Sequence, residues 1–352
     1  HLILGMLTGF LLVVSGCRPA PSPKGPAFKP LAPSVLDAGN ALAEARALVA
    51  LSPRAAGTPG ARQAAGHLLV RLQAVGVQST LDAFTDETPA GKTTFWNVMG
   101  VIPAAGPDSP IPTLREVGRE AAKAPWIFLG SHFDTKSGLG AGFEGANDSA
   151  SSSGLLLELA RVLQAAGPLP VNIGIAFFDG EECLHSYTAH DGLHGSRHAA
   201  RALCLNRRVD QVRAVIILDM IGDRDLTVTI PRNSTSDLAS RVFRAAAAEK
   251  VRDKFTLMAG ALLDDHQPFL EAGMPAVDLI DFEYGSAPGR NDYWHTPQDT
   301  LDKLSAESLG IVGRVVIRML NGLMMEARES AKLRGSTELA EVRSATPRQV
   351  KR

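Results

Sequence analysis

Acidic residues and histidines, which are the oxygen and nitrogen ligands that zinc accepts, gather at a few points of this chain. They occur, in order, at His132-Phe133-Asp134, Asp148, Asp179-Gly180-Glu181-Glu182, Asp219 and His295. A catalytic zinc site uses three such ligands and leaves a further position open for water or substrate. Asp148, Glu182 and His295 would supply such a set.

The two residues of the adjacent pair Glu181-Glu182 are expected to have different roles. Neighbouring residues at the end of a strand point in different directions, so one carboxylate can bind the metal while the other faces the substrate. A carboxylate that is partly desolvated beside a cation can serve as general acid and base. We therefore expect Glu182 to be a ligand and Glu181 to carry protons.

These clusters follow runs of residues that resemble buried strands, such as IFLGS before His132, IAFF before Asp179 and VIIL before Asp219. Strands are expected at 77–85, 94–102, 125–130, 171–178, 213–221, 226–231 and 273–282, and helices at 37–50, 60–75, 150–166, 196–203, 235–250 and 301–333. Their alternation predicts an α/β fold with three layers, αβα, around a mostly parallel, mixed central sheet. Ligands of such sheets bind at the carboxyl ends of the strands.

Composition fits a folded enzyme and excludes nucleic-acid binding. Of 352 residues, 36 are Lys or Arg and 37 are Asp or Glu, and no basic block is interleaved with aromatics. With 45% apolar residues the chain can bury a sizeable core. We expect one catalytic domain over residues 35–334 and a disordered tail over residues 335–352.

The amino-terminal segment is typical of an exported lipoprotein. Residues 1–16 are apolar and uncharged, which predicts a signal peptide whose basic start is missing. Val14-Ser15-Gly16-Cys17 resembles a bacterial lipobox, so Cys17 would be acylated and would hold the chain to a lipid bilayer. Residues 17–34 are proline-rich and predict an extended tether. The protein would then lie in the cell envelope of a bacterium, facing outside the cytoplasm. An ordinary secretory signal with a chance cysteine is the alternative.

Eight motifs, taken in order, resemble the zinc aminopeptidase and glutaminyl cyclase superfamily from about residue 40 to residue 330. The motifs are SPRAAGTPG, GSHFDTK, GANDSASSSGLLLELARVL, FFDGEE, HGSRH, LDMIGD, DDHQPFLEAGMPA and YWHTPQDTLDKL. Aminopeptidases of this superfamily hold two zinc ions through ligands that would here be His132, Asp148, Glu182, Asp219 and His295. The ligand inventory alone does not separate the branches.

Flanking residues favour the glutaminyl cyclase branch. The DGEE segment, the spacing from Glu181 to HGSRH, the Asp264-Asp265-His266 sequence and the indole of Trp294 all resemble the cyclases. Tyr187 stands where the cyclases carry a second tryptophan, and so would form a smaller part of the aromatic wall. Trp294 and Tyr187 are therefore the expected substrate-binding residues.

The resemblance implies a glutaminyl-peptide cyclotransferase that converts the N-terminal glutamine of peptides or proteins to pyroglutamate and releases ammonia. One Zn²⁺ on Asp148, Glu182 and His295 would suffice, with His132 a ligand only if a second metal binds. Glu181 would shuttle protons, while Asp219 and Asp264 would be catalytic carboxyls that share one proton. The alternatives are an aminopeptidase with two zinc ions and an inactive lipoprotein that binds peptides.

The remaining cysteines and histidines have simpler interpretations. Cys183 and Cys204 would either form a disulfide or be small buried residues. Four histidines in a loop-like stretch are expected to be polar surface residues: His185, His190, His194 and His198. His266 is expected to anchor its loop, and Trp96 and Trp126 to lie in the core.

Overall fold

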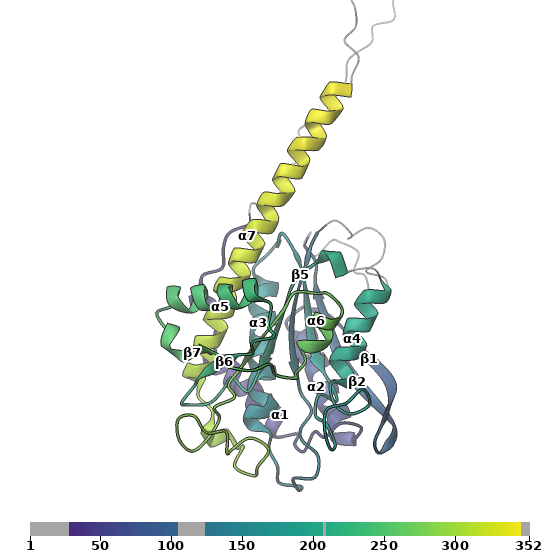
Figure 1. Cartoon of the computed structure of the whole chain (residues 1–352), viewed down its shortest axis with the longest axis vertical. Helices are drawn as coiled ribbons and strands as arrows, with labels where there is room; N and C mark the ends of the chain where they lie inside the picture. Colours follow the sequence, from purple (N-terminus) through teal and green to yellow (C-terminus); the bar gives the residue numbers. More distant parts are fainter. Residues whose placement is uncertain (1–27, 105–123, 207–208, 346–352) are drawn as a thin grey trace, which may run out of the picture.

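A computed structural model describes residues 28–104, 124–206 and 209–345, and this part of the chain forms three layers (Figure 1). The middle layer is an eight-stranded sheet with the order β1-β2-β4-β3-β5-β8-β6-β7. Its strands are β1 (Gln78–Thr88), β2 (Gly91–Ile102), β3 (Trp126–His132), β4 (Asn172–Phe178), β5 (Val212–Asp219), β6 (Val228–Ile230), β7 (Phe255–Leu257) and β8 (Ala276–Ile280). The adjacent strands β4, β3, β5 and β8 are parallel, whereas β2 and β6 join them antiparallel. The predicted αβα architecture with a mixed sheet is confirmed.

Each face of the sheet has its own apolar core, because successive side chains of a strand point to opposite faces. In β3, Ile127 and Leu129 join one core, while Trp126 and Phe128 join the other. The first core is covered by α1 (Ala38–Val49), α2 (Pro59–Ala74), α3 (Ser152–Ala165), α5 (Ser236–Ala248) and α7 (Ala306–Ala345). The second is covered by α4 (His194–Leu205) and the short α6 (Gln267–Glu271). Trp126 is buried in the core as predicted.

Local sequence explains where the first helices begin and how closely they pack. Asp37 accepts a hydrogen bond from the backbone N–H of Asn40 at the start of α1, and the Thr58 side chain caps α2 ahead of Pro59. Helix α1 then packs against Gly154 of α3 at close range. A Cβ atom at Gly154 would lie 2.5 Å from the carbonyl oxygen of Ala41. This contact fixes the helix that directly follows the Asp148 segment.

Two short elements were not predicted, and both depend on distant partners. Strand β7 has three residues and pairs only with β6. Helix α6 has five residues and packs through Phe269 against the second core. Elements this short carry too few residues to show a periodic pattern in the sequence.

The two ends of the domain differ from the prediction. Helix α7 continues to Ala345, so the disordered tail expected from residue 335 is wrong as far as Ala345. The segment 335–345 lacks proline and contains the run Glu338-Leu339-Ala340-Glu341 of good helix formers, so little stops the helix. The folded body also begins before residue 35, because the backbone of Leu31 exchanges two hydrogen bonds of 2.8 Å with the side chain of Asn321 on α7. Residues 346–352, the predicted signal peptide over 1–16 and Cys17 lie outside the described residues.

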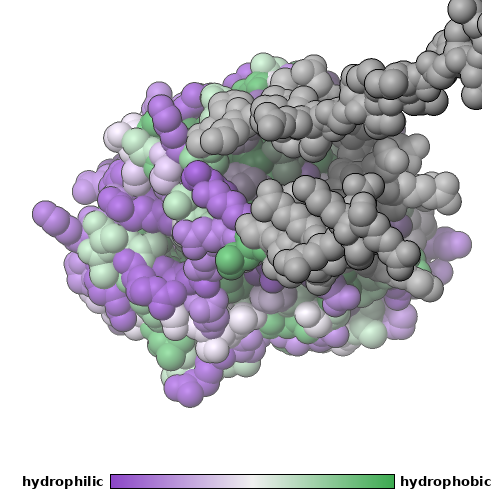
Figure 2. Space-filling view, turned by 90° about the horizontal axis from the view of Figure 1, so that it is seen from above, coloured by the Kyte–Doolittle hydropathy of each residue, from purple (hydrophilic) through white to green (hydrophobic). Residues whose placement is uncertain are grey.

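Helix α7 runs from one end of the sheet to the other. Just before it, the N–H of Ser305 donates to the carbonyl of Gly222, in the loop that follows β5. The helix extends beyond the upper end of the sheet (Figure 1), and the carbonyl of Phe28 accepts a hydrogen bond of 3.2 Å from Arg328 of this helix. Seen from above, the coloured surface of that end is mostly hydrophilic, with small separate apolar patches (Figure 2). The most apolar window of Ala306–Leu333 is 72% buried within the protein, so this helix contributes to the core.

Candidate active site and metal centre

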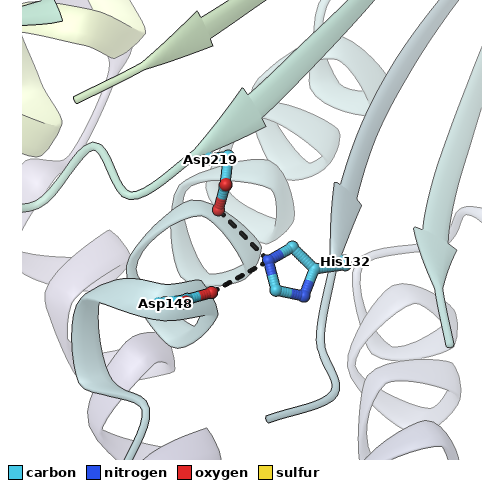
Figure 3. Close-up of side chains that lie close together, drawn as sticks. All are labelled: His132, Asp148 and Asp219. Atoms are coloured by element: carbon cyan, nitrogen blue, oxygen red, sulfur yellow. Dashed lines mark hydrogen bonds and ion pairs between the residues drawn. The ribbon is translucent and has the colours of Figure 1, made fainter. Parts of the chain in front are cut away.

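The first group of metal-binding side chains surrounds His132, the last residue of β3 (Figure 3). Its Nε2 lies 3.1 Å from Oδ1 of Asp148 and 3.2 Å from Oδ1 of Asp219, which ends β5. Burial by itself would lower the pKa of His132, but the charge of Asp219 and hydrogen bonds to three aspartates raise it well above its ordinary value. The three donor atoms lie within 4.8 Å of one another and could hold a metal ion. We call this group the inner triad.

A second group shares Asp148 and reaches toward the surface. Nε2 of His295 lies 3.0 Å from Oε1 of Glu182 and 3.3 Å from Oδ2 of Asp148. These atoms also lie within 4.8 Å of one another. His295 is held with φ at 54°, a left-handed conformation that is costly outside glycine and common at functional sites. We call Asp148, Glu182 and His295 the outer triad, and it is the ligand set predicted from the sequence.

Two further carboxylates hold the loops that carry these ligands. Asp134 accepts the backbone N–H groups of Glu181 and Glu182, at 3.1 and 3.2 Å. Asp299 accepts the N–H of Asp148 at 3.1 Å and the hydroxyl of Tyr284 at 2.9 Å. Partners of this kind orient metal ligands and tune their affinity. Both aspartates belong to motifs noted in the sequence, but neither was assigned a role there.

Arg54 is a structural residue of the site that sequence reasoning missed. It is fully buried, and burial lowers its pKa to about 10. Its guanidinium donates to the carbonyl oxygens of Phe133 at 2.8 Å, Glu144 at 3.0 Å and Gly145 at 2.9 Å. It thereby ties the segment after His132 to the segment before Asp148. SPRAAGTPG was noted only as one of the motifs of the resemblance, and an arginine inside such an apolar segment was the available signal.

A pocket of about 220 Å³ opens onto Asp148 and His295 of the outer triad and onto Glu181. Its acidic side carries Asp148, Glu181, Asp219 and Asp264, and its other walls carry Tyr187, Met220, Ala261, Leu262, Leu263, Ile280, Phe282, Trp294 and His295. Glu181 is buried, and burial, opposed by the charge of His132, raises its pKa well above its ordinary value. A buried carboxyl with a raised pKa at the wall of a pocket can both give and take a proton near neutral pH.

Asp219 and Asp264 lie close together, as expected for carboxyls that share a proton. Burial raises the pKa of Asp219 to about 7; the charge of His132 opposes this rise and that of Asp264 adds to it. The acidic cluster is larger than predicted. Asp278 of β8 is fully buried beside them, and burial together with the charges of Asp264 and Asp219 raises its pKa well above the ordinary value. Like charges this close cannot all ionise cheaply.

Both aromatic residues expected to bind substrate line this pocket. The indole of Trp294 stacks on the imidazole of His295, with ring centroids 4.0 Å apart, and touches Phe282. The hydroxyl of Tyr187 donates to Oε1 of Glu181 at 2.8 Å. Their contact with substrate stays a prediction, while the contact between Tyr187 and Glu181 was not foreseen.

The other histidines and cysteines lie apart from the two triads. His194 and His198 are four residues apart on α4 and pair with Asp86 and Asp82 of β1. They therefore do lie one turn apart on a helix, contrary to the sequence interpretation, but they brace β1 rather than form a metal group among the described residues. His266 anchors its loop through Asn233, as expected. Cys183 is buried and Cys204 is exposed, and both are free thiols.

Comparison with known proteins shows which family has this arrangement of residues. The model of peptidase family M28 matches residues 115–320, which include both triads and Glu181. The chain belongs to peptidase family M28, in its glutaminyl cyclase branch. The branch rests on relatives that match most of the chain.

A crystal structure of Acidobacteriales bacterium glutaminyl cyclase is 32% identical, with a TM-score of 0.73 over 86% of this chain and 99% of that one. The bovine (Bos taurus) glutaminyl-peptide cyclotransferase-like protein is 28% identical over 75% of this chain and 70% of its own length. A Zn-dependent exopeptidase from Parabacteroides distasonis, 22% identical over 84% of this chain and 99% of its own, shares the fold with a TM-score of 0.68. One fold is thus shared by glutaminyl cyclases and a Zn-dependent exopeptidase.

Proposed function

We propose that this enzyme cyclises the N-terminal glutamine of peptides or proteins to pyroglutamate with release of ammonia, using one zinc ion on the outer triad. The observation that carries the proposal is the position of Glu181. This buried carboxyl lines the same pocket as Asp148 and His295 of the outer triad, together with several apolar and aromatic side chains. An acid-base group, a metal site and an apolar wall around one small pocket are what this reaction needs.

The outer triad suits zinc in both chemistry and accessibility. It offers one nitrogen and two carboxylates, and its His295 side chain is 18% exposed, whereas that of His132 is 1% exposed. Oε2 of Glu182 is buried and accepts no hydrogen bond from the described residues; Nζ of Lys136 forms an ion pair with it at 3.5 Å. Three ligands with an open side are the arrangement of a catalytic zinc site. When bound there, zinc would act as a Lewis acid on the side-chain carbonyl of the substrate glutamine.

The residues of the chain would then carry out the proton transfers. The α-amine nitrogen of the substrate forms a bond to its own side-chain amide carbon, and the bond from that carbon to the amide nitrogen breaks. Glu181 takes the proton released by the amine and gives a proton to the departing ammonia. Asp219 and Asp264, holding one proton between them, would accept hydrogen bonds from the substrate amine and keep its lone pair directed at the carbon. Trp294 and Tyr187 would enclose the glutamine side chain.

A second candidate function rests on the inner triad. His132, Asp148 and Asp219 could hold a second ion beside the first, and an aminopeptidase would use it to grip the α-amine of its substrate. Cyclisation instead requires that this amine stay free to attack. Zinc stoichiometry and the released product therefore separate the two functions.

We also propose that Cys17 carries a lipid and holds the enzyme to a membrane of the bacterial envelope. The lipobox-like sequence supports this, and so does the position of Phe28, the first described residue, whose carbonyl accepts a hydrogen bond of 3.2 Å from Arg328, well beyond the start of α7. In such an arrangement the pocket would face free peptides or proteins rather than the bilayer. Expression of the full precursor with labelled palmitate should label the protein, and Cys17→Ser should not be labelled.

The test of the proposed activity uses the protein from Phe28 onward, one equivalent of zinc and a peptide that begins with glutamine, followed by mass spectrometry. We expect loss of one ammonia from the intact peptide. Glu181→Gln should keep its zinc while turnover falls about 10²–10⁴-fold, since it removes the proton carrier but no ligand. Glu283→Gln, in the loop after β8, is a matched control and should behave like the wild type. Release of free glutamine and a shortened peptide would instead establish the aminopeptidase.

A further inference from the structure

One tyrosine points inward from an otherwise exposed loop beside the site. In the segment 184–190, which follows Glu181, Glu182 and Cys183, only Tyr187 is half-buried and the other residues are exposed. A side chain of an exposed loop keeps an inward direction only if the backbone of that loop is held in place.

The loop is closed by one aspartate. The carboxylate of Asp191 accepts the backbone N–H groups of Leu184, His185 and Ser186. Beyond it, the N–H of Leu193 donates to the carbonyl of Glu181 at 2.9 Å. The two ends of the loop are therefore held beside Glu181 by backbone contacts that do not involve the tyrosine.

The ring and the hydroxyl of Tyr187 are both fixed inside this frame. The ring lies directly on Gly192, where an added Cβ would stand 2.5 Å from Cδ1 of Tyr187. Gly192 also has φ at 81°, a conformation suited to glycine. The hydroxyl donates to Oε1 of Glu181 at 2.8 Å. Burial and the nearby glutamates raise the pKa of Tyr187 far above its ordinary value, so the phenol keeps its proton and acts as a donor.

We propose that Tyr187 is the positioning residue for Glu181: its hydroxyl holds Oε1, so that Oε2 is the oxygen that exchanges protons with the substrate. A glutamate side chain has several rotatable bonds, and a free carboxylate would sample orientations that cannot reach the amine. Fixing one oxygen removes this rotational freedom before the substrate binds. Enzymes gain rate when a reacting group is held in its reactive geometry in advance. The inference rests on the proposed role of Glu181 as proton carrier, but it assigns to Tyr187 more than a place in the aromatic wall.

The decisive variant is Tyr187→Phe, which keeps the ring and deletes the hydroxyl. With the glutamine peptide and zinc-loaded enzyme, we expect kcat to fall about 10- to 100-fold, the range for a lost hydrogen bond to a charged group. KM should change by less than about twofold, because the ring that faces the pocket remains. Zinc content and melting temperature should match the wild type. Tyr293→Phe deletes a hydroxyl from a tyrosine that does not line the pocket, and should leave kcat unchanged.

Gly192→Ala tests the same contact from the other side, because its methyl group pushes the ring of Tyr187 away. We expect it to lower kcat in the wild-type background but to cause little further loss in the Tyr187→Phe background, a coupling that a double-mutant cycle measures. If Tyr187→Phe raises KM and leaves kcat unchanged, the tyrosine is only part of the wall and the inference is overturned. Failure of the wild-type enzyme to release ammonia would overturn the proposed function itself, whatever the variants do.

Discussion

The inner and outer triads share Asp148 but differ in their surroundings. Oδ1 of Asp148 faces His132, which is buried at the end of β3, and Oδ2 faces His295, which comes from a loop at the mouth of the pocket. Similar ligand types thus form one group whose histidine is enclosed and one group whose histidine lines the pocket. The difference shows that ligand identity does not determine function, because the pocket reaches the histidine of the outer triad but not that of the inner triad.

The largest effect on zinc binding and activity is expected when the histidine of each triad is replaced in turn. His295→Gln should lose zinc and all measurable cyclisation, because it removes a ligand of the catalytic ion. His132→Gln should keep one zinc and lose about 10- to 100-fold in activity, as is usual when a supporting residue of a metal site is lost. Zinc content by elemental analysis and ammonia release by a coupled assay give both results. Zinc loss in His132→Gln with retention in His295→Gln would reverse the assignment of the two triads.

Arg54 should affect both triads together, since it ties the segment after His132 to the segment before Asp148. Arg54→Met leaves several buried carbonyl groups without donors, and each costs about 1–3 kcal/mol. We expect the free energy of unfolding of the zinc-loaded protein to fall by at least about 2 kcal/mol, and zinc affinity to weaken. Urea denaturation and chelator competition measure these changes, and Arg54→Lys should recover part of them. An unchanged zinc affinity would mean that the loops hold Asp148 without the arginine.

The smallest expected effect is a pH dependence of stability that zinc suppresses. Burial raises the pKa of Asp219 and of Asp299 to about 7; Asp264 adds to the first shift and Asp148 to the second. A carboxyl whose pKa is higher in the folded than in the unfolded state stabilises the fold below about pH 4 and loses that contribution as the pH rises through about 7.

Urea midpoints of the zinc-free protein should therefore fall between about pH 4 and pH 7. Zinc should flatten this slope, because a cation offsets the crowded carboxylates and binds better to deprotonated ligands. Asp299→Asn should make the slope of the zinc-free protein shallower. A zinc-free midpoint that rises with pH would show that these carboxyls are ionised without cost, and that the buried side of the site is better solvated than its geometry indicates.

The sequence predicted the central elements well because they are long and strongly patterned. The apolar runs before His132, Asp179 and Asp219 became β3, β4 and β5, each buried on both faces. The three-residue β7 and the contacts of Leu31 with α7 could not be predicted in this way, since both depend on partners far away in the chain. The prediction ended the closing helix at residue 333 because the sequence beyond it is mostly polar.

What the sequence by itself determined is the set of zinc-binding and acid-base residue types, their order, and their place at the carboxyl ends of strands. These follow from local pattern and from the rule that such ends meet at one edge of a sheet. Only the tertiary structure decided that Asp148 lies between two histidines, that Arg54 joins their loops and that Tyr187 reaches Glu181. Loop side chains take their directions from hydrogen bonds to distant backbone groups, and residue spacing along the chain does not encode those partners.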